Sequence, residues 1–308
     1  MQKMCILENR LKLAKQLLMG NITIINKTIK PFNKTVQIEG DKSLSIRWAL
    51  IASQAVGKSS AINILKSGDV LSTLNCLRKL GVKVSLFKNR CIINGLGING
   101  YKYKKKITLD AGNSGTLGRL IIGLLIHSTN RIKIIGDKSL SRRDFSRITN
   151  PLKKFGAKIN SNKGKLPVFI EGTENPKPIK FIENKGSAQC KTAIMFASLN
   201  TKGTTIIKAK KSRNHTELLF KYLKLPIKVN RKKNFDLIKI DGKKKISAFN
   251  YKIPSDISSS AFFIVLTALS KKSKLKIKNV NINPSRIGII KVLKLMGVKI
   301  FLKNINFY

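Results

Sequence analysis

The sequence predicts an α/β protein made of repeated βαβαββ units, and two observations support this prediction. Segments with the periodicity of amphipathic helices alternate with short apolar runs that are typical of strands. A helix end followed by Gly or Pro and then by a strand also occurs four times along the chain. The punctuating residues are Gly81, Gly156, Pro226 and Gly297, at intervals of 75, 70 and 71 residues. This regular spacing indicates one structural unit used four times.

The first two repeats define the expected unit. In the first repeat we expect strands at 35–38 and 61–64, helices at 45–56 and 70–80, and a hairpin at 82–95. In the second repeat we expect a strand at 107–110, helices at 115–127 and 145–155, and a hairpin at 157–172. Both hairpins end on glycine, at Gly95 and Gly172, which supports the same topology in the two repeats.

The last two repeats follow the same order, but the fourth is incomplete. We expect helices at 188–199 and 216–225 in the third repeat, whose hairpin closes at Gly242, and helices at 258–269 and 286–296 in the fourth. The fourth hairpin begins at 298–302, and the sequence ends at Tyr308. Because half a hairpin leaves an unpaired strand edge, we expect this chain to be a C-terminally truncated form of a longer protein.

The formal net charge of +48 raises the question of whether the chain binds nucleic acid. The basic residues are 50 Lys and 12 Arg, and the lysines are scattered through every expected strand and turn. Because they form no single stripe, we predict no nucleic-acid partner and attribute the abundant Lys, Asn and Ile to an AT-rich coding bias. The alternative is a basic nucleic-acid binder, whose affinity would fall steeply with salt.

The cysteines favour a cytoplasmic protein without a metal centre. Cys5, Cys76, Cys91 and Cys190 form no CxxC pair and have no histidine cluster beside them, which argues against a zinc site and a disulfide framework. No run of about 18 or more apolar residues occurs, so we expect no membrane span. Residues 1–20 lack the short apolar core and the cleavage site of a secretory signal.

The first helix of each repeat begins with small and polar residues. These starts are Lys42-Ser43, Asn113-Ser-Gly-Thr116, Ser187-Ala-Gln189 and Ser258-Ser-Ser260. Backbone N–H groups at a helix N-terminus lack intrahelical partners and favour an anion. If the first three repeats pack with pseudo-symmetry, their helix starts converge into one phosphate or carboxylate site. The competing interpretation is ordinary helix capping beside solvated basic side chains.

Arginines also occur near these helix starts, in loops that we expect to contact a ligand. Five of the 12 arginines lie there, namely Arg47, Arg119, Arg142, Arg143 and Arg213. Arginine is the better bidentate partner for phosphate and carboxylate, so its presence in these loops supports an anion site. Asp41, Asp137 and Asp256 stand near the starts of elements, and we expect them to be caps or turn formers rather than acids or bases.

Read as strings, five motifs resemble the EPSP synthase family, the 3-phosphoshikimate 1-carboxyvinyltransferases. The motifs are Gly40-Asp-Lys-Ser-Leu-Ser-Ile-Arg47, Gly112-Asn-Ser-Gly-Thr-Leu-Gly-Arg119, Ser187-Ala-Gln189, Ser212-Arg-Asn-His-Thr-Glu217 and Asn283-Pro-Ser-Arg-Ile-Gly288. The match runs in order from about residue 22 to the end of the chain. Five ordered motifs are far more specific than any one of them.

The resemblance implies an inside-out α/β barrel of two lobes, each built from three βαβαββ units, with the active site between them. It implies transfer of the enolpyruvyl group of phosphoenolpyruvate to the 5-hydroxyl of shikimate 3-phosphate, with release of phosphate, in aromatic amino acid biosynthesis. It implies no metal and no organic cofactor. We therefore divide the chain into an N-terminal extension with a strand leading from the second lobe (1–34), a complete first lobe (35–247) and the first repeat of an incomplete second lobe (248–308).

The resemblance also assigns roles to site residues. Lys42 matches the family lysine that contacts both substrates and takes part in proton transfer, and it is the expected catalytic residue. The expected ligands of shikimate 3-phosphate are Lys42, Ser43, Arg47, Ser187, Gln189 and Arg213. The expected ligands of phosphoenolpyruvate are Lys42, Gly115, Arg143 and Gln189, with Asn113 and Arg119 in support.

Three positions depart from the usual family residues. Ile46 stands where the family usually has His, and Asp144 stands where it usually has Pro. Gly115 stands where glyphosate-tolerant relatives carry Ala. If a methyl group there is what excludes glyphosate, the resemblance implies that this site binds it.

A family member of full length would have two more repeats in the second lobe, with the catalytic aspartate and glutamate and further arginine and lysine ligands. We expect them in a separately encoded C-terminal fragment, or in a part of the protein outside this sequence, and we expect the completed enzyme to be a monomer. Two alternatives stay open from the sequence. One is a non-catalytic lobe that only binds shikimate 3-phosphate. The other is an enolpyruvyl transferase for a UDP-sugar, against which the Gly-Asp-Lys-Ser motif argues.

Overall fold

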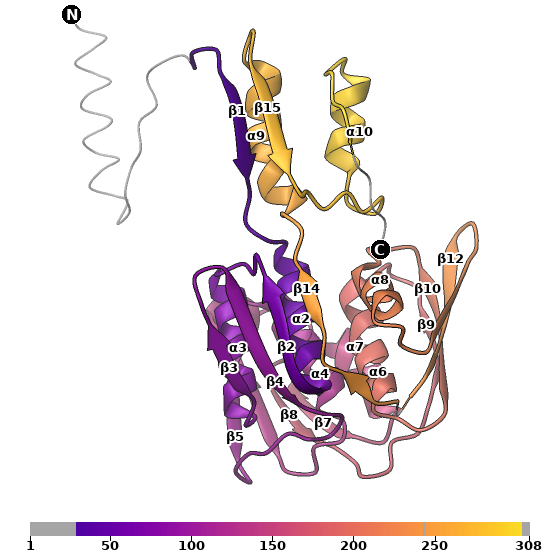
Figure 1. Ribbon diagram of the computed structural model, residues 1–308. Coiled ribbons are helices and arrows are strands. Elements are labelled where there is room, and N and C mark those ends of the chain that lie inside the picture. The colour runs from indigo at the N-terminus through magenta and orange to yellow at the C-terminus, as the bar shows by residue number, and fades with distance from the viewer. Residues whose placement is uncertain (1–28, 243, 304–308) are drawn as a thin grey trace, which may run out of the picture.

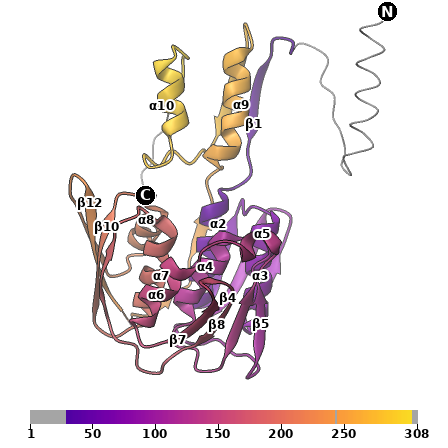
Figure 2. The same ribbon diagram turned by 180° about the vertical axis from the view of Figure 1, so that it is seen from behind.

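The computed structural model describes residues 29–242 and 244–303 of the 308-residue chain (Figure 1). Three helices occupy the middle of its larger body, with sheets around them: α2 (Lys42–Gln54), α4 (Gly115–Leu124) and α7 (Ala188–Leu199). Almost every residue of α2 and α7 is buried, so both helices are enclosed on all sides. A helix enclosed in this way lies inside a core, which agrees with their central position in Figures 1 and 2.

The second and third repeats have the predicted βαβαββ topology. The second consists of β5 (Ile107–Asp110), α4, β6 (Ile132–Ile135), α5 (Lys138–Ser141), α6 (Ser146–Lys153), β7 (Lys158–Asn162) and β8 (Lys165–Glu171). The third consists of β9 (Lys180–Glu183), α7, β10 (Thr204–Lys210), α8 (His215–Tyr222), β11 (Ile227–Arg231) and β12 (Phe235–Asp241). Their sheets have equivalent strand orders, β5-β6-β8-β7 and β9-β10-β12-β11. The expected helix at 188–199 has the bounds of α7, whereas the short α5 was not expected.

The first repeat differs from its prediction in two strands, because the strand expected at 61–64 begins six residues earlier and the strand expected at 35–38 belongs to another sheet. Its sheet contains β2 (Ala55–Ile62), β3 (Lys83–Leu86) and β4 (Arg90–Leu96), with α3 (Gly68–Lys79) packed on them. The strand expected at 35–38 is β1 (Asn33–Gln37), but it pairs in parallel with β15 (Lys274–Lys278) and not with β2. Its assignment to the first repeat is therefore wrong.

A later segment of the chain occupies the position next to β2 where the first strand of the repeat was expected. β13 (Ile246–Ser247) and β14 (Asn250–Lys252) both pair with β2 in parallel. β1 lies at the boundary expected at 35 but pairs with β15, which comes after the boundary expected at 247. β14 also comes after residue 247 but pairs with β2 of the first repeat. Each part of the chain therefore contributes a strand to a sheet of the other part. The alternating pattern of a strand specifies which face is buried but not which strand lies beside it, so the exchange was not visible in the sequence.

The smaller body contains β1, β15, α9 (Ile257–Leu269) and α10 (Gly288–Leu295), as Figure 1 shows. Its helices are apolar yet exposed: Phe262 and Leu269 of α9 are each 80% exposed, and Leu295 of α10 is 89% exposed. The strand expected at 298–302 does not form, because no partner strand lies beside it in the described part of the chain. The sheets of the described residues remain separate and do not close into a barrel.

Two further expectations concern particular parts of the chain. Residues 1–20, including Cys5, lie outside the described residues. Within the described ranges, no helix combines the length and the apolar character that crossing a bilayer requires.

Cys76, Cys91 and Cys190 are buried free thiols, and burial raises the pKa of each to about 12.

Candidate functional site

The three central helices each begin at a side-chain cap. Asp41 Oδ1 accepts from the backbone N–H of Leu44 at 2.9 Å at the start of α2. Ser114 and Ser187 do the same at α4 and α7, where their hydroxyls accept N–H groups at 3.2 Å. Asp137 and Asp256 also cap helices, α5 and α9. The prediction that these aspartates are caps is confirmed, and the caps fix where each helix starts.

Arg47 joins three helices at this end of the core. The residue is only 3% exposed, and its Nε–H donates to the hydroxyl of Thr216 on α8 at 2.8 Å. Its Nη1 donates to the carbonyl of Ser43 at 3.0 Å, and its Nη2 lies 3.4 Å from the hydroxyl of Thr192 on α7. A guanidinium has five N–H groups, so two remain for a ligand beyond these three contacts in the described structure.

The surroundings of Arg47 are strongly positive. Burial lowers the pKa of Arg47 to about 10, which Asp41 and Glu217 oppose and Arg213 and Arg286 reinforce. Burial, followed by the charge of Arg286, also lowers the pKa of Arg213. An anion placed here would neutralise this charge, and the residues that lie around it are those of the Arg-Asn-His-Thr-Glu motif.

His215 lies in the same cluster and is 3% exposed. Its pKa lies well below the usual value, first because burial disfavours the imidazolium and then because Arg47, Arg286 and Arg213 repel it. Its Nε2 has no hydrogen-bond partner within the described residues. His215 is therefore a neutral side chain among cations.

A second array lies between α4 and α7. Arg119 Nη1 donates to the side-chain carbonyl of Gln189 at 2.8 Å, and Gln189 Nε2 donates to the hydroxyl of Thr116 at 3.2 Å. The guanidinium of Arg119 stacks over the ring of Phe145 at 5.0 Å. Burial, and then repulsion from Arg147 and Arg143, lowers the pKa of Arg119. The array is a second positive region, built on the adjacent helix starts.

Gly115 lies next to two arginines of this second array. A Cβ atom at Gly115 would lie 3.1 Å from Nη1 of Arg119 and 3.2 Å from Nη1 of Arg143. Both distances are shorter than ordinary van der Waals contact, so the two guanidinium groups approach this backbone as closely as a glycine permits. Arg143 itself is exposed, and its charge faces the array.

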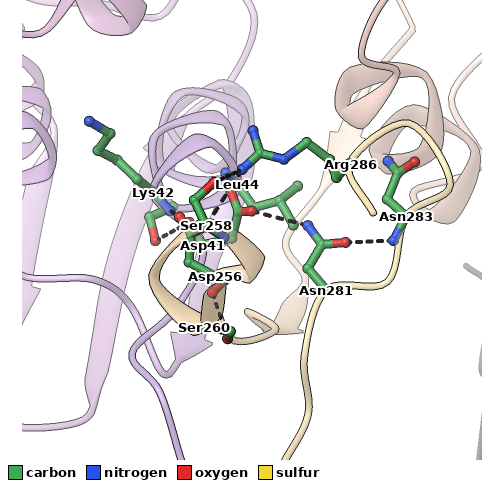
Figure 3. A network of polar contacts seen from close by, with 10 residues as sticks. Asp41, Lys42, Leu44, Asp256, Ser258, Ser260, Asn281, Asn283 and Arg286 are labelled. Atoms are coloured by element: carbon green, nitrogen blue, oxygen red, sulfur yellow. Dashed lines mark hydrogen bonds and ion pairs between the residues drawn. The ribbon is translucent and has the colours of Figure 1, made fainter. Parts of the chain in front are cut away.

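Lys42 lies at the start of α2, and its ammonium is paired with a carboxylate that belongs to neither array. Its Nζ forms an ion pair with Asp69 at 3.1 Å, and its side chain is 48% exposed. Figure 3 shows this side chain directed away from a network in which Asp256 accepts the Lys42 backbone N–H at 3.2 Å. The predicted catalytic lysine is thus at the edge of the site, held by a carboxylate that the sequence did not single out.

The same network ties the smaller body to the helix starts. Asn281 donates to Asp41 Oδ2 at 3.1 Å, and Arg286 donates to Ser258 at 2.7 Å and lies 3.6 Å from Asp256 (Figure 3). Burial, and then the charge of Asp256, raises the pKa of Asp41. The Asn-Pro-Ser-Arg motif therefore lies where α2 and α9 begin.

The other predicted residues lie at the margins of the arrays. Ser43 contacts Arg47 through its carbonyl, and Ser187 caps α7 while its own N–H donates to Glu183 at 3.0 Å. Asn113 is exposed and donates to Asp137 at 2.6 Å, so it supports the loop before α5. Residues 115, 119 and 143 thus belong to one region, with Asn113 beside it, and residues 43, 47 and 213 belong to the other. The described contacts of Ser187 are those of a helix cap and join it to neither array.

Threonine side chains are the part of the site that sequence reasoning missed. Thr192 and Thr216 hydroxyls lie 2.7 Å apart and both contact Arg47, and Thr116 holds Gln189. Thr216 was inside a recognised motif, which was a usable signal. Thr192 lies within a buried helix, where nothing in the local sequence distinguishes it from a core residue.

The arrangement can bind two anions side by side. Each array offers arginine N–H groups, small helix-start residues and amide or hydroxyl partners, which is the chemistry of phosphate and carboxylate recognition. The described residues contain no group of three or more His, Cys, Asp or Glu side chains that could hold a metal ion.

The comparisons with family models and with curated proteins point to the same family. The family model for EPSP synthase (3-phosphoshikimate 1-carboxyvinyltransferase) matches residues 26–306. A 3-phosphoshikimate 1-carboxyvinyltransferase of Vesicomyosocius okutanii subsp. Calyptogena okutanii (strain HA) is 41% identical over 280 residues, which cover 90% of this chain and 63% of the relative. A protein of the same name from Streptococcus pyogenes serotype M1 is 37% identical over 279 residues, which cover 90% of this chain and 64% of that relative.

Solved structures agree with the sequence comparison. A structure of EPSP synthase from Acinetobacter baumannii superposes with a TM-score of 0.79 at 35% identity, covering 87% of this chain and 60% of that one. The chain therefore spans less than two thirds of the length of the relatives that it matches. Since the family model covers most of its residues, this chain belongs to the EPSP synthase family.

Proposed function

We propose that this chain contributes the first-lobe half of an active site that transfers the enolpyruvyl group of phosphoenolpyruvate to the 5-hydroxyl of shikimate 3-phosphate. The observation that carries the proposal is the meeting of two arginine arrays at the starts of α2, α4 and α7. Residues of four of the five recognised motifs form these arrays. Family membership supplies the reaction, and the two arrays supply places for its two anionic substrates.

Shikimate 3-phosphate occupies the array around Arg47. The two unused N–H groups of Arg47 and the guanidinium of Arg213 bind the phosphate, and the hydroxyls of Ser43 and Ser187 complete its contacts. A phosphate dianion there counteracts the repulsion among cations that, together with burial, lowers the pKa of Arg47 and Arg213.

Phosphoenolpyruvate occupies the array between α4 and α7. Arg143 binds it beside the open backbone of Gly115, while Arg119 and Asn113 support the loop and Gln189 lies between the two substrates. This position brings C2 of phosphoenolpyruvate toward the acceptor hydroxyl, so that addition and then elimination of phosphate take place between the arrays.

Lys42 is the proposed catalytic residue. To serve both substrates, its ammonium exchanges the contact with Asp69 for the substrate anions, and its exposed side chain leaves it free to rotate. In this position it carries positive charge to the reacting atoms and takes part in proton transfer.

The remaining third of the relatives supplies the second half of the site. We propose that a complementary C-terminal polypeptide, or a continuation of the same chain, provides the acidic groups that general acid–base catalysis requires. The completed enzyme is a monomer in the cytoplasm, a compartment that the free buried thiols favour. The competing function is a lobe that binds shikimate 3-phosphate without turnover.

One experiment separates these possibilities. The chain is titrated with shikimate 3-phosphate by calorimetry, and phosphate release from both substrates is measured with and without a polypeptide that supplies the last third of a relative. Binding with turnover only after addition supports the proposed function, and binding without turnover in both cases supports the binding lobe. Absence of binding and of turnover would overturn the proposal.

A further inference from the structure

A buried ion pair lies next to the Arg47 array. Glu217 ends the Arg-Asn-His-Thr-Glu motif, whereas Lys191 belongs to none of the five motifs, and no role has so far been assigned to the pair. Lys191 Nζ on α7 lies 2.5 Å from Glu217 Oε1 on α8, and the two side chains are 0% and 3% exposed. Within the described residues, Lys191 Nζ and Glu217 Oε2 have no hydrogen-bond partner beyond this pair. Burying two charges with so few compensating contacts is costly, so the pair needs an explanation other than stability.

The pair is next to the two threonines that hold Arg47. Lys191 precedes Thr192 on α7, and Glu217 follows Thr216 on α8. The two hydroxyls lie 2.7 Å apart, and the guanidinium of Arg47 contacts both. An ion pair therefore fixes the distance between α7 and α8 one residue away from each contact that orients Arg47.

Resting on the proposed function, we propose that Lys191 and Glu217 are a positioning pair, which sets the geometry of Arg47 for the phosphate of shikimate 3-phosphate. The pair acts through Thr192 and Thr216 and does not touch the substrate. It also keeps the Glu217 carboxylate engaged with Lys191, so that Glu217 does not take the N–H groups of Arg47 that the phosphate requires.

The sharpest test removes both charged side chains of the pair at once. Lys191→Met with Glu217→Leu leaves the net charge unchanged and strands no buried charge, so this double variant folds. We expect it to bind shikimate 3-phosphate about tenfold more weakly, because the threonines and Arg47 are coupled neighbours of the pair. We also expect the Arg47 Nε–H signal, protected in the parent chain by its bond to Thr216, to broaden in proton–nitrogen NMR spectra.

A second variant separates positioning from simple electrostatics. Glu217→Gln removes a negative charge near the phosphate. An electrostatic effect alone would therefore tighten binding, whereas loss of positioning weakens it. The control is Lys158→Met with Glu171→Leu, which removes an exposed pair of the same type at 3.8 Å and leaves binding and the Arg47 signal unchanged.

Different results would overturn the positioning role of the Lys191–Glu217 pair and the proposed function. Parent affinity together with an unchanged Arg47 signal in the Lys191→Met, Glu217→Leu variant would overturn the positioning pair. If the parent chain itself does not bind shikimate 3-phosphate, the proposed function fails, and the Arg47 signal alone decides whether the pair orients this arginine.

Discussion

At the scale of the residue, the site depends on how few hydrogen-bond partners its arginines have. Arg47 has three contacts and two remaining N–H groups, and Arg119 is held by an amide and an aromatic ring rather than by a carboxylate. A carboxylate partner would satisfy an arginine and compete with an anionic substrate. Neutral partners orient the guanidinium and leave its charge available.

Gly115→Ala should weaken binding at the second array without unfolding the chain. The new Cβ would press on Arg119 and Arg143, whose flexible ends can move by a few tenths of an ångström. Because a shift of about 1 Å can cost roughly a hundredfold, we expect inhibition by glyphosate to weaken at least roughly tenfold, measured as phosphate release in the presence of the complementary C-terminal polypeptide.

The matched control for this prediction is Gly118→Ala, one turn further along α4. Its Cβ would meet Ala111 and Phe145 at 3.4 Å, which is ordinary contact, so we expect little change in inhibition. An inhibition curve that is flat up to millimolar glyphosate with Gly115 in place would contradict the expectation that this site binds the inhibitor.

His215 should make the chain less stable as the pH falls below about 6.5, the ordinary pKa of histidine. The unfolded chain binds a proton there, while burial keeps His215 neutral in the folded state, so the free energy of unfolding falls by up to about 1.4 kcal/mol per pH unit. His215→Gln removes this dependence, and His127→Gln serves as the control. Thermal unfolding from pH 7 to 5 measures it; equal slopes in the parent and His215→Gln would contradict the assignment.

At the scale of the element, side-chain caps decide where the functional helices start. The first turns of α2, α4 and α7 are positioned by Asp41, Ser114 and Ser187, each bonded to an N–H three residues further along. Asp41 does more than the others, because its second oxygen also accepts from Asn281 of the smaller body. One carboxylate thus connects a helix start with the loop that contacts it.

Asp41→Ala should destabilise the chain more than Asp137→Ala. Asp41 is fully buried, and its loss removes a cap and leaves the Asn281 donor without its acceptor, an effect of about 1–2 kcal/mol. Asp137 caps the four-residue helix α5 at the surface, so its replacement costs less. Urea unfolding of both variants compares the two losses, and equal midpoints would argue against the connecting role of Asp41.

At the scale of the whole molecule, the two bodies are joined by chain segments that pair with each other. Gly40 and Ser255 form an antiparallel bridge, and the N–H groups of Asp41 and Asp256 donate to Pro254 and Glu39. A Cβ at Gly40 would lie 1.9 Å from the carbonyl of Asn63, so only glycine fits at this crossing. The paired crossing keeps Arg286 and Asn281 beside the helix starts.

The sequence by itself determined the repeat, most helices and the caps. Helical periodicity, Gly and Pro stops and the capping aspartates are local properties, so they can be recognised one segment at a time. We expected Arg47 and Arg119 in loops, but they lie within α2 and α4, where each belongs to an array.

Only the tertiary structure decided which segments meet. The pairing of β1 with β15, the Asp69 partner of Lys42, the threonines behind Arg47 and the Lys191–Glu217 pair all join residues far apart in the chain. Such contacts depend on how buried helices pack and on which charges must find a partner once water is excluded. A local pattern carries no record of that partner, which is why the residues around the arginines became known only with the fold.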